Sequence, residues 1–362
     1  MTTEDPARDR SWLSTLGRLL PGRSTRTAPA QDDLYQQAEA LILGGPRKYS
    51  RTDLVATTGI EADYATRIWR SLGFAEVGDD DKVFTDGDLT ALRNLMELRA
   101  DGLVPDGLEE TVARSVGLAM AGLANWQIDM IYQLVDYGHN DLTARQIIDI
   151  GDEVLPLLKE MQTYVWRRHL AAAAGRLLTG MPGQSDTREL VIGFADMVGF
   201  TRASRQLSPA ELSALIEEFQ NVTSDVVAHG HGRVVKTVGD EVLFVADQPA
   251  DGAEIALTLL ERLAESPTLP ELRIGLAVGP VTSRFGDVYG EVVNIAARLT
   301  TNARPGRILV DRNLAAVLEN DSRFHVRVRR PLAVRGYRHL QSWGLTRARN
   351  SDIRRQSTPE SS

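Results

Sequence analysis

Two aspartates, Asp196 and Asp240, are the residues best suited to chemistry in this sequence. Asp196 follows a short apolar stretch, 190–195, which is typical of a strand, and Asp240 stands between two strand-like stretches at Gly239. Strand ends can meet at one edge of an antiparallel sheet, so the two carboxylates can come together. With no His or Cys nearby, paired carboxylates suit Mg²⁺ or Mn²⁺. Taken alone, Asp196 would be interpreted as a surface residue and Asp240 as a turn residue. Together they predict a metal site whose two ions would activate an attacking hydroxyl and clamp phosphates.

Further residues are suited to holding phosphate groups. Gly199, Phe200 and Thr201 come directly after Asp196, where backbone N–H groups and a helix start can face phosphate oxygens. We therefore predict that Phe200 and Thr201 contact a substrate. Arg335, in the stretch Val-Arg-Gly, is predicted to hold the terminal phosphates.

Lys236 and Asp287 together match one nucleotide base. A lysine within a strand is ordinarily a residue that reaches for solvent, and Asp287 would ordinarily be a turn residue. As a pair, an ammonium that only donates and a carboxylate that only accepts match the adenine edge, where N1 accepts and the N6 amino group donates. Guanine has the opposite pattern, so the pair predicts ATP over GTP.

Asn294 and Arg298 are four residues apart and therefore share one face of a predicted helix. Ordinary helix-surface residues are the plain alternative. In a catalytic interpretation, the asparagine orients a ribose and the arginine neutralises the charge that develops on a transferring phosphorus.

The elements that must position these residues alternate between strand and helix periods. Ser208, Pro209 and Glu211 form a capping box with proline at the first helical position. The predicted elements are a strand at 190–195, a helix at 208–229, strands at 233–238 and 241–246, a helix at 251–264, a strand at 273–278, a helix at 291–300 and β-structure between 307 and 345. The order β-α-β-β-α-β predicts an α+β fold of the ferredoxin-like type.

The N-terminal half is predicted to be all helical. Its longest helix covers 152–178 with an apolar stripe of helical period, and the stretch Gly-Met-Pro-Gly at 180–183 ends it. We expect five segments: a disordered tail at 1–30, a helical regulatory domain at 31–150, a switch helix and hinge at 151–183, a catalytic domain at 184–347 and a disordered tail at 348–362.

Composition narrows the classes of function. The 362 residues are enough for two folded units, and the net charge of −8 gives no general reason to bind nucleic acid or an anionic membrane. A helix-turn-helix is conceivable at 49–72, but its second helix offers only Arg67 and Arg70 as basic residues, so a packing role is favoured over DNA binding. The chain contains no cysteine, starts without the apolar core of a signal peptide and lacks a run of about 18 apolar residues. These features fit the cytoplasm and predict no transmembrane segment.

Three stretches resemble the class III nucleotidyl cyclases: FADMVGF at 194–200, KTVGDE at 236–241 and NIAAR at 294–298. The resemblance covers about 188–345, and the intervals between the motifs are also similar to those of the family. It implies that Asp196 and Asp240 bind the metal ions, which would be Mg²⁺ or Mn²⁺. It further implies adenine recognition by Lys236 and Asp287 and transition-state stabilisation by the pair at positions 294 and 298.

The resemblance also implies a reaction and an assembly. The expected reaction is adenylate cyclase activity, in which the ribose 3′-OH of ATP attacks the α-phosphorus and pyrophosphate leaves, giving cyclic AMP. Two catalytic domains of such enzymes meet head to tail, so a homodimer with two shared sites is expected. Arg335 departs from the family, whose members often carry lysine there, and this puts the geometry of phosphate binding in doubt.

The N-terminal half more distantly resembles the helical regulatory domain of pH-responsive bacterial cyclases, which restrains the catalytic dimer. The resemblance implies that the helix at 152–178 moves and that His169 is one pH-sensitive group. A plain exposed helix histidine is the other interpretation of His169.

Two other functions remain as alternatives. A guanylate or diguanylate cyclase shares the core topology, but Val238 stands before Gly239 where diguanylate cyclases have a second glycine. A catalytically silent nucleotide-binding regulator would be expected to lack a metal or transition-state residue, whereas this chain has them all.

Overall fold

The computed structural model divides into two compact units, one on each side of the boundary between Gly180 and Met181. The residues described are 29–104, 107–137, 144–179, 187–284, 286–334 and 337–348. The predicted tails at 1–30 and 348–362 lie outside this set except for residues 29, 30 and 348. Among the described residues, no helix combines the length and apolar character needed to cross a membrane.

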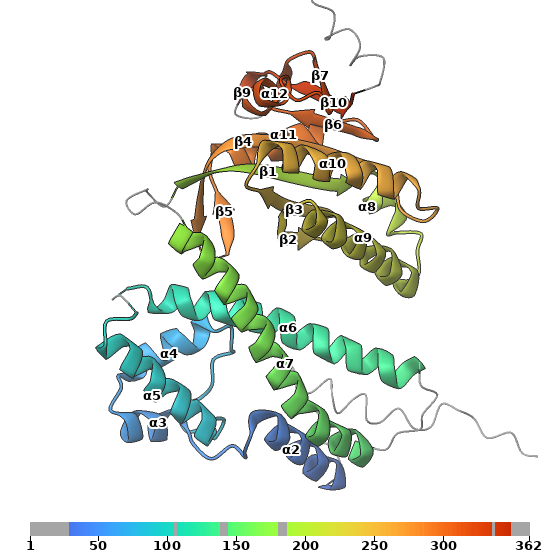
Figure 1. Ribbon diagram of the computed structural model, residues 1–362. Coiled ribbons are helices and arrows are strands. Elements are labelled where there is room, and N and C mark those ends of the chain that lie inside the picture. The colour runs from blue at the N-terminus through green and yellow to red at the C-terminus, as the bar shows by residue number, and fades with distance from the viewer. Residues whose placement is uncertain are drawn as a thin grey trace, which may run out of the picture. The chain divides into compact units, whose positions relative to one another are not determined.

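The first unit, here called the helical unit, is all helical, as expected (Figure 1). Its helices are α2 (Pro29–Leu43), α3 (Arg51–Thr58), α4 (Ala62–Ser71), α5 (Asp86–Ala100), α6 (Glu109–Tyr137) and α7 (Ala144–Thr179). Capping boxes begin two of them: Ser50 caps α3, and Thr85 caps α5. Leu54, Phe84 and Leu89 form a small buried core between these helices.

Helices α3 and α4 form the helix pair that was considered as a DNA reader. The two arginines of α4 have acidic partners in the same unit: Arg67 Nε lies 3.0 Å from a carboxylate oxygen of Glu110, and Arg70 Nη2 lies 2.6 Å from one of Glu76. Both arginines of α4 therefore make ion pairs with acidic residues of the helical unit itself.

The predicted switch helix corresponds to α7, which begins eight residues earlier than expected. Gly151 lies inside α7, and a Cβ at this position would lie 3.3 Å from a methyl group of Leu41 in α2. The glycine therefore permits close helix packing and does not end a helix. Pro156 lies inside α7, and the predicted boundary between 150 and 151 also falls within this helix.

The second unit, here called the sheet unit, is built on one large sheet. It comprises β1 (Thr187–Met197), α8 (Phe200–Ala203), α9 (Pro209–His229), β2 (Arg233–Val238), β3 (Glu241–Ala246), α10 (Pro249–Ala264), β4 (Leu272–Arg284), β5 (Asp287–Tyr289), α11 (Glu291–Asn302), β6 (Arg307–Val310), α12 (Arg312–Leu318), β7 (Phe324–Val328), β8 (Leu332–Val334), β9 (Tyr337–Leu340) and β10 (Trp343–Arg347).

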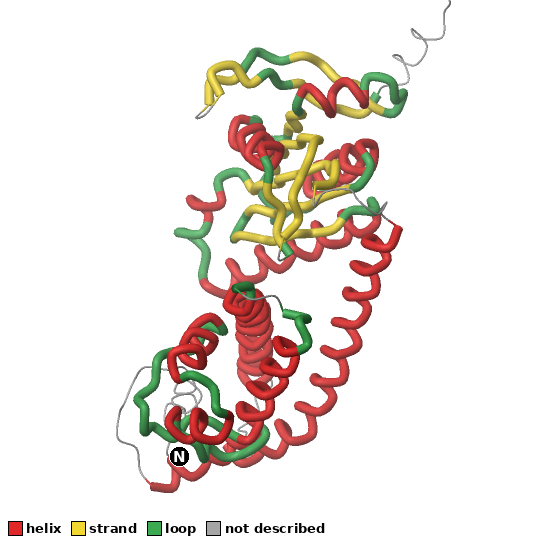
Figure 2. Tube along the Cα trace, turned by 90° about the vertical axis from the view of Figure 1, so that its left-hand side faces the viewer, coloured by secondary structure: helices red, strands yellow, loops and turns green. Residues whose placement is uncertain are grey.

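The sheet has the strand order β2-β3-β1-β4-β6-β10-β7. Its first four strands pair antiparallel, and β6 then joins β4 in parallel. The order β2-β3-β1-β4 with the two helices α9 and α10 between its strands is the predicted β-α-β-β-α-β arrangement, so the α+β fold class is confirmed. Figure 2 shows the strands of this sheet in yellow between red helices.

Helices cover both faces of the sheet. One face packs against α9 and α10 through a large core that includes Phe219, Phe244 and Ile255. On the other face, α11 contributes Val292 and Ala296 to a second core. Because side chains alternate along a strand, the central strands β1, β3 and β4 each supply both cores.

Strand β1 is longer than predicted, and this corrects the placement of Asp196. The aspartate lies within the strand, one residue before its end, and does not follow it. The reason is that β4 pairs with β1 along its whole length, as far as Met197 opposite Leu272. The strand predicted at 273–278 is longer for the same reason.

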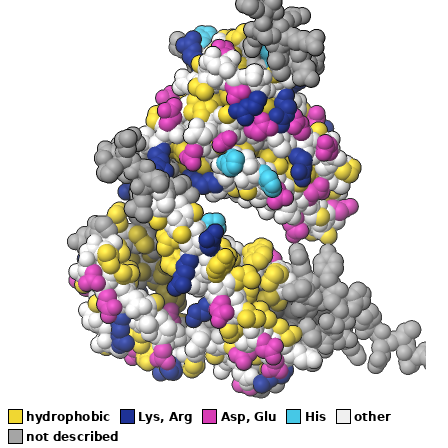
Figure 3. All heavy atoms as spheres, viewed as in Figure 1, with side chains coloured by type: hydrophobic (Ala, Val, Ile, Leu, Met, Phe, Trp, Pro, Cys, Tyr) yellow, Lys and Arg dark blue, Asp and Glu magenta, His cyan; other side chains and the backbone are white. Residues whose placement is uncertain are grey.

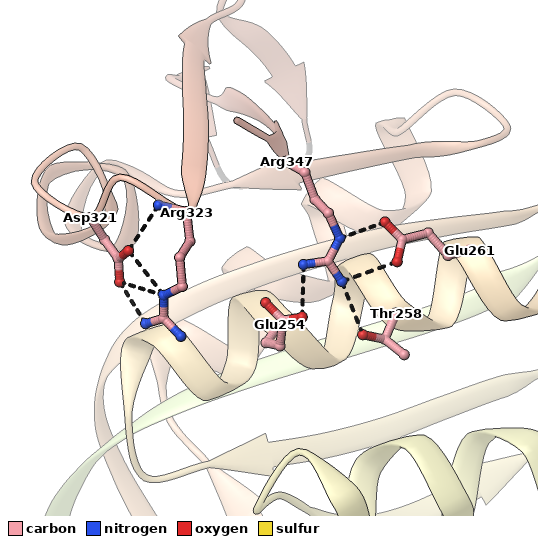
Figure 4. A network of polar contacts seen from close by, with 6 residues as sticks. All are labelled: Glu254, Thr258, Glu261, Asp321, Arg323 and Arg347. Atoms are coloured by element: carbon pink, nitrogen blue, oxygen red, sulfur yellow. Dashed lines mark hydrogen bonds and ion pairs between the residues drawn. The ribbon is translucent and has the colours of Figure 1, made fainter. Parts of the chain in front are cut away.

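Arg347, at the end of β10, connects this last strand to helix α10 (Figure 4). Its guanidinium donates to both carboxylate oxygens of Glu261 at 2.6 and 3.0 Å and lies 2.7 Å from an oxygen of Glu254, both on α10. The hydrogen bond to Glu261, followed by the contact with Glu254, raises the pKa of Arg347. These contacts hold strand β10 against helix α10.

Candidate active site

Three carboxylates gather at the end of β1. Asp196 stands opposite Glu241 of β3, and the Met197 N–H donates to the backbone carbonyl of Asp240 at 3.1 Å. The predicted hairpin between β2 and β3 is present, and its tight turn at Gly239 has φ 61°, a conformation that favours glycine. The structure therefore brings together the two aspartates that the sequence singled out.

The electrostatics of this cluster suit a cation. Burial raises the pKa of Asp240 above its ordinary value, and the nearby charge of Asp196 raises it further. Burial likewise raises the pKa of Glu241, with added contributions from both aspartates. A divalent ion would relieve this repulsion, and carboxylate oxygens are the ligands that Mg²⁺ and Mn²⁺ prefer. The described residues contain no group of three or more His, Cys, Asp or Glu side chains arranged to hold a metal. An ion held by the two aspartates would therefore take ligands from other groups, such as substrate phosphates.

Arg273 belongs to the same cluster and was not predicted. It stands opposite Asp196 across β1 and β4, and its Nε donates to Asp196 Oδ2 at 2.5 Å. Its Nη1 also donates to the backbone carbonyl of Thr301 at 3.2 Å, at the end of α11. The strand register creates this contact between residues far apart in sequence, so no local motif could have identified it. A cation beside the carboxylates that are predicted to bind metal would also be well placed for a polyphosphate.

Lys236 and Asp287, the predicted base-recognition pair, lie together. Lys236 Nζ is 2.5 Å from Asp287 Oδ2, which joins β2 to the start of β5. Partial burial raises the pKa of Asp287, but the hydrogen bonds from Lys236 and from the Val288 N–H outweigh it and lower the pKa overall. The lysine side chain remains about half exposed, so both groups are accessible to a ligand.

Asn294 and Arg298 lie on the exposed side of α11. Ala296, midway between them, is fully buried against the sheet. At 100° per residue, positions two before and two after a buried residue point away from it. The structure thus puts both predicted transition-state residues on one face of the helix, directed away from the sheet that bears their own chain's aspartates.

The remaining predicted residues lie at α8 or outside the described set. Gly199 caps α8 with φ 81°, and Phe200 at the start of this helix packs against the large core. Thr201 is exposed beside it. Arg335 falls outside the described residues.

The acidic cluster and the base-recognition pair are separate within one chain. Asp196 lies opposite Glu241, which in turn lies opposite Val238, and Lys236 is two residues further along β2. With strands spaced about 4.8 Å apart and a rise of about 3.3 Å per residue, the Cα atoms of Asp196 and Lys236 are about 12 Å apart. The structure therefore assembles the predicted residues into separate groups on one chain.

Comparison with known proteins gives consistent matches. Residues 184–347 match the family of adenylate and guanylate cyclase catalytic domains. An adenylate cyclase of Streptomyces coelicolor is 43% identical over 306 residues, which cover 83% of this chain and 80% of that protein. An adenylate cyclase of Streptomyces griseus is 41% identical, covering 85% of this chain and 77% of that protein. A pH-sensitive adenylate cyclase of Mycobacterium tuberculosis is 31% identical, covering 72% of this chain and 68% of that protein.

Proposed function

The chain belongs to the adenylate and guanylate cyclase family, and we propose that it converts ATP into 3′,5′-cyclic AMP and pyrophosphate at active sites shared by two copies of the chain. Adenylate cyclase is the activity named for relatives that align over most of both proteins. The guanylate and diguanylate cyclase alternatives, and the silent regulator, are outcomes of the experiments below.

The observation that carries the proposal is the contact between Lys236 and Asp287. An ammonium and a carboxylate 2.5 Å apart present a donor and an acceptor side by side. Adenine offers the complementary acceptor at N1 and donor at N6, whereas guanine offers a donor at N1 and an acceptor at O6. Bound adenine would take over hydrogen bonds that the two side chains now make with each other.

The other residues account for the reaction at the phosphate. Asp196 and Asp240 would hold the divalent ions, which supply activation of the ribose 3′-OH and neutralisation of phosphate charge when bound. Arg273, beside Asp196, supplies a further cation to the polyphosphate. Asn294 orients the ribose, and Arg298 stabilises the charge that builds up on the α-phosphate during in-line attack.

The arrangement of these groups supports a homodimer. Asn294 and Arg298 face away from the sheet of their own chain, which bears Asp196 and Asp240. In a head-to-tail pair, the aspartates of one chain would meet the base-recognition and transition-state residues of the other. Each dimer would then contain two complete sites.

Product analysis tests the activity. Purified full-length protein with Mn²⁺ should form cyclic AMP from ATP and much less cyclic nucleotide from GTP supplied separately. Asp240→Asn should abolish turnover while the chain stays folded. Absence of cyclic AMP at every pH from acid to neutral would refute the proposed activity and favour a silent regulator.

The helical unit is proposed to regulate the catalytic dimer, and pH is the proposed stimulus. The named pH sensitivity of the Mycobacterium tuberculosis relative supports this proposal. His169 on α7 is exposed and is one candidate sensor. The test compares full-length protein with a fragment that begins at Gln184, across pH. Higher activity of the fragment at neutral pH would mean inhibition by the helical unit. Identical pH profiles would refute a regulatory role, and an unchanged profile in His169→Ala would exclude that residue alone.

A further inference from the structure

The C-terminal strands carry a concentration of positive charge. Residues 322–350 contain eight arginines and neither aspartate nor glutamate, although the whole chain has a net charge of −8. Two of these arginines have acidic partners (Figure 4): Arg323 Nη2 lies 2.6 Å from a carboxylate oxygen of Asp321, and Arg347 binds two glutamates of α10. Figure 3 likewise shows Lys and Arg side chains, in dark blue, near acidic ones, in magenta, on the sheet unit. The arginines without such partners therefore need a separate explanation.

Basic side chains from two strands share one face of the sheet. Leu309 of β6 packs against α11, so Arg307, two residues earlier, projects from the same face. Gly344 of β10 stands opposite Leu309, and Arg327 of β7 stands opposite Gly344, which places Arg327 on this face as well. Positions 325 and 329 follow the same alternation along β7 and just beyond its end. We call the four basic residues of this face the basic strip: Arg307, His325, Arg327 and Arg329.

Strand β10 gives the basic strip a floor of small residues. A Cβ on Gly344 would lie 2.6 Å from Arg329 Nε and 2.8 Å from its Nη2, so the glycine leaves the space in which this guanidinium lies on the sheet. Thr346 is exposed and stands opposite His325, and the register of β10 with β6 continues to place it beside Arg307. With strands about 4.8 Å apart, the Cα atoms of Arg307 and His325 lie about 10 Å apart on either side of Thr346. An anion above Thr346 is therefore within reach of basic side chains from both neighbouring strands.

No acidic side chain balances the basic strip within the described part of the chain. All four of its side chains are exposed, and none of them makes an ion pair or a hydrogen bond with another described residue. Charges on an edge strand are ordinarily explained as protection against pairing with another chain, and β7 is an edge strand. That explanation does not cover Arg307, because β6 lies inside the sheet between β4 and β10. A bound anion would relieve the repulsion among these cations.

The arrangement fits a phosphate group. A phosphate ester carries a charge of about −1.5 to −2 and three acceptor oxygens, and the planar fork of an arginine binds such oxygens through paired hydrogen bonds. A carboxylate has only two oxygens in one plane, so it would serve fewer of the cations that approach from two strands. The location is separate from the proposed catalytic cluster, since Thr346 lies three strands from Asp196 in the same register, about 14 Å between Cα atoms.

We propose that the basic strip is a second anion site, which binds a phosphate-bearing ligand above Gly344 and Thr346 through the guanidinium groups of Arg307, Arg327 and Arg329. Two sources offer this chemistry: a free phosphate compound and the headgroup of an anionic lipid. The experiment has one arm for each. The inference stands independently of the proposed activity, because it uses no residue assigned to that activity.

Calorimetric titration with inorganic pyrophosphate is the arm for a free ligand. Full-length protein is titrated in EDTA, so that metal-dependent binding at the proposed catalytic cluster does not contribute. The wild type should bind saturably, and Arg327→Gln should bind about tenfold more weakly, because one charge-assisted hydrogen bond is lost. Arg262→Gln is the matched control, since it removes the same charge from an exposed arginine of α10, on the other face of the sheet. It should bind as the wild type does.

Gly344→Ala tests the geometry without changing any charge. The added methyl group would displace the Arg329 guanidinium, whose flexible side chain can move aside without unfolding the sheet. Pyrophosphate binding should therefore weaken severalfold while the melting temperature stays close to that of the wild type. Equal affinity of this variant and the wild type would contradict the placement of the ligand above Gly344.

Sedimentation with lipid vesicles is the second arm. Binding to phosphatidylglycerol vesicles but not to phosphatidylcholine vesicles, lost in Arg327→Gln and kept in Arg262→Gln, would identify a lipid headgroup as a ligand. Binding of both vesicles and pyrophosphate would mean that the phosphate group is recognised from either source. The proposal is overturned if neither ligand binds. It is also overturned if Arg262→Gln weakens binding as much as Arg327→Gln, because general attraction to a charged surface would then explain the result.

Discussion

The substitution Gly275→Ala should displace helix α11 while the rest of the fold stays in place. Gly275 lies in β4 where α11 crosses it, and an added Cβ would lie 2.3 Å from the backbone N of Thr300 and 2.5 Å from the carbonyl oxygen of Ala296. Backbone atoms cannot rotate aside, so α11 must move by about 1 Å to restore an ordinary contact. Overpacking of this kind costs about 1–3 kcal/mol of unfolding free energy.

The same displacement should reduce catalysis, because α11 bears Asn294 and Arg298. A misplacement of about 1 Å can lower a rate by about a hundredfold. Gly275→Ala is therefore expected to shift the denaturant midpoint downward and to lower kcat by about two orders of magnitude. Cyclic AMP formation at saturating ATP and equilibrium unfolding measure the two effects.

Gly279→Ala is the matched control on the same strand and under the same helix. Its added Cβ would meet Val292 atoms at 3.7 Å, which is ordinary contact. Alanine also lowers the entropy of the unfolded chain, so this variant should be as stable as the wild type or slightly more stable. If the two variants behave alike in stability and in kcat, the close approach of α11 does not position the proposed transition-state residues, and the reasoning is wrong.

Three further predictions concern the proposed site. Asp240→Ala and Arg298→Ala should each be inactive alone. An equal mixture of the two variants should recover about a quarter of wild-type activity, because half of the dimers contain one chain of each kind and each such dimer has one intact site out of two. No recovery after subunit exchange would argue against shared sites. Lys236→Glu should reduce the preference for ATP over GTP by about tenfold or more, because one charge-assisted hydrogen bond to the base is lost. Unchanged selectivity in competition assays would show that Lys236 does not recognise the base. Mn²⁺ should raise the melting temperature of the wild type but not of Asp240→Asn, and an equal rise in both would place the ion elsewhere.

Local chemistry made much of the sheet unit predictable. Ser208 and Glu211 form the expected capping box, with the Glu211 N–H donating to Ser208 Oγ at 3.3 Å and the Ser208 N–H donating to the Glu211 carboxylate at 2.8 Å. The turn at Gly239 joins two strands whose bounds are those expected. In such cases the signal lies within a few neighbouring residues, so the tertiary fold has little opportunity to override it.

The ends of elements were less predictable, because other segments determine them. The paired strand β4 extends β1 beyond its apolar run, so that Asp196 is part of the ladder. Helix α7 begins at Ala144, ahead of the predicted start at 152, and Gly151 inside it packs close to α2. A residue's neighbours in sequence do not disclose which partner segment it will meet.

For this protein, the sequence by itself determined the identity of the candidate catalytic groups and the order of the elements that bear them. Their motifs are local, and the side chains that can hold a divalent ion or match an adenine edge follow from their chemistry. Only the tertiary structure decided which groups meet. Strand register sets Arg273 against Asp196, the approach of β5 to β2 sets Asp287 against Lys236, and the packing of α7 against α2 sets Gly151 against Leu41. Such contacts join residues far apart in the chain, and they exist only once the chain has folded.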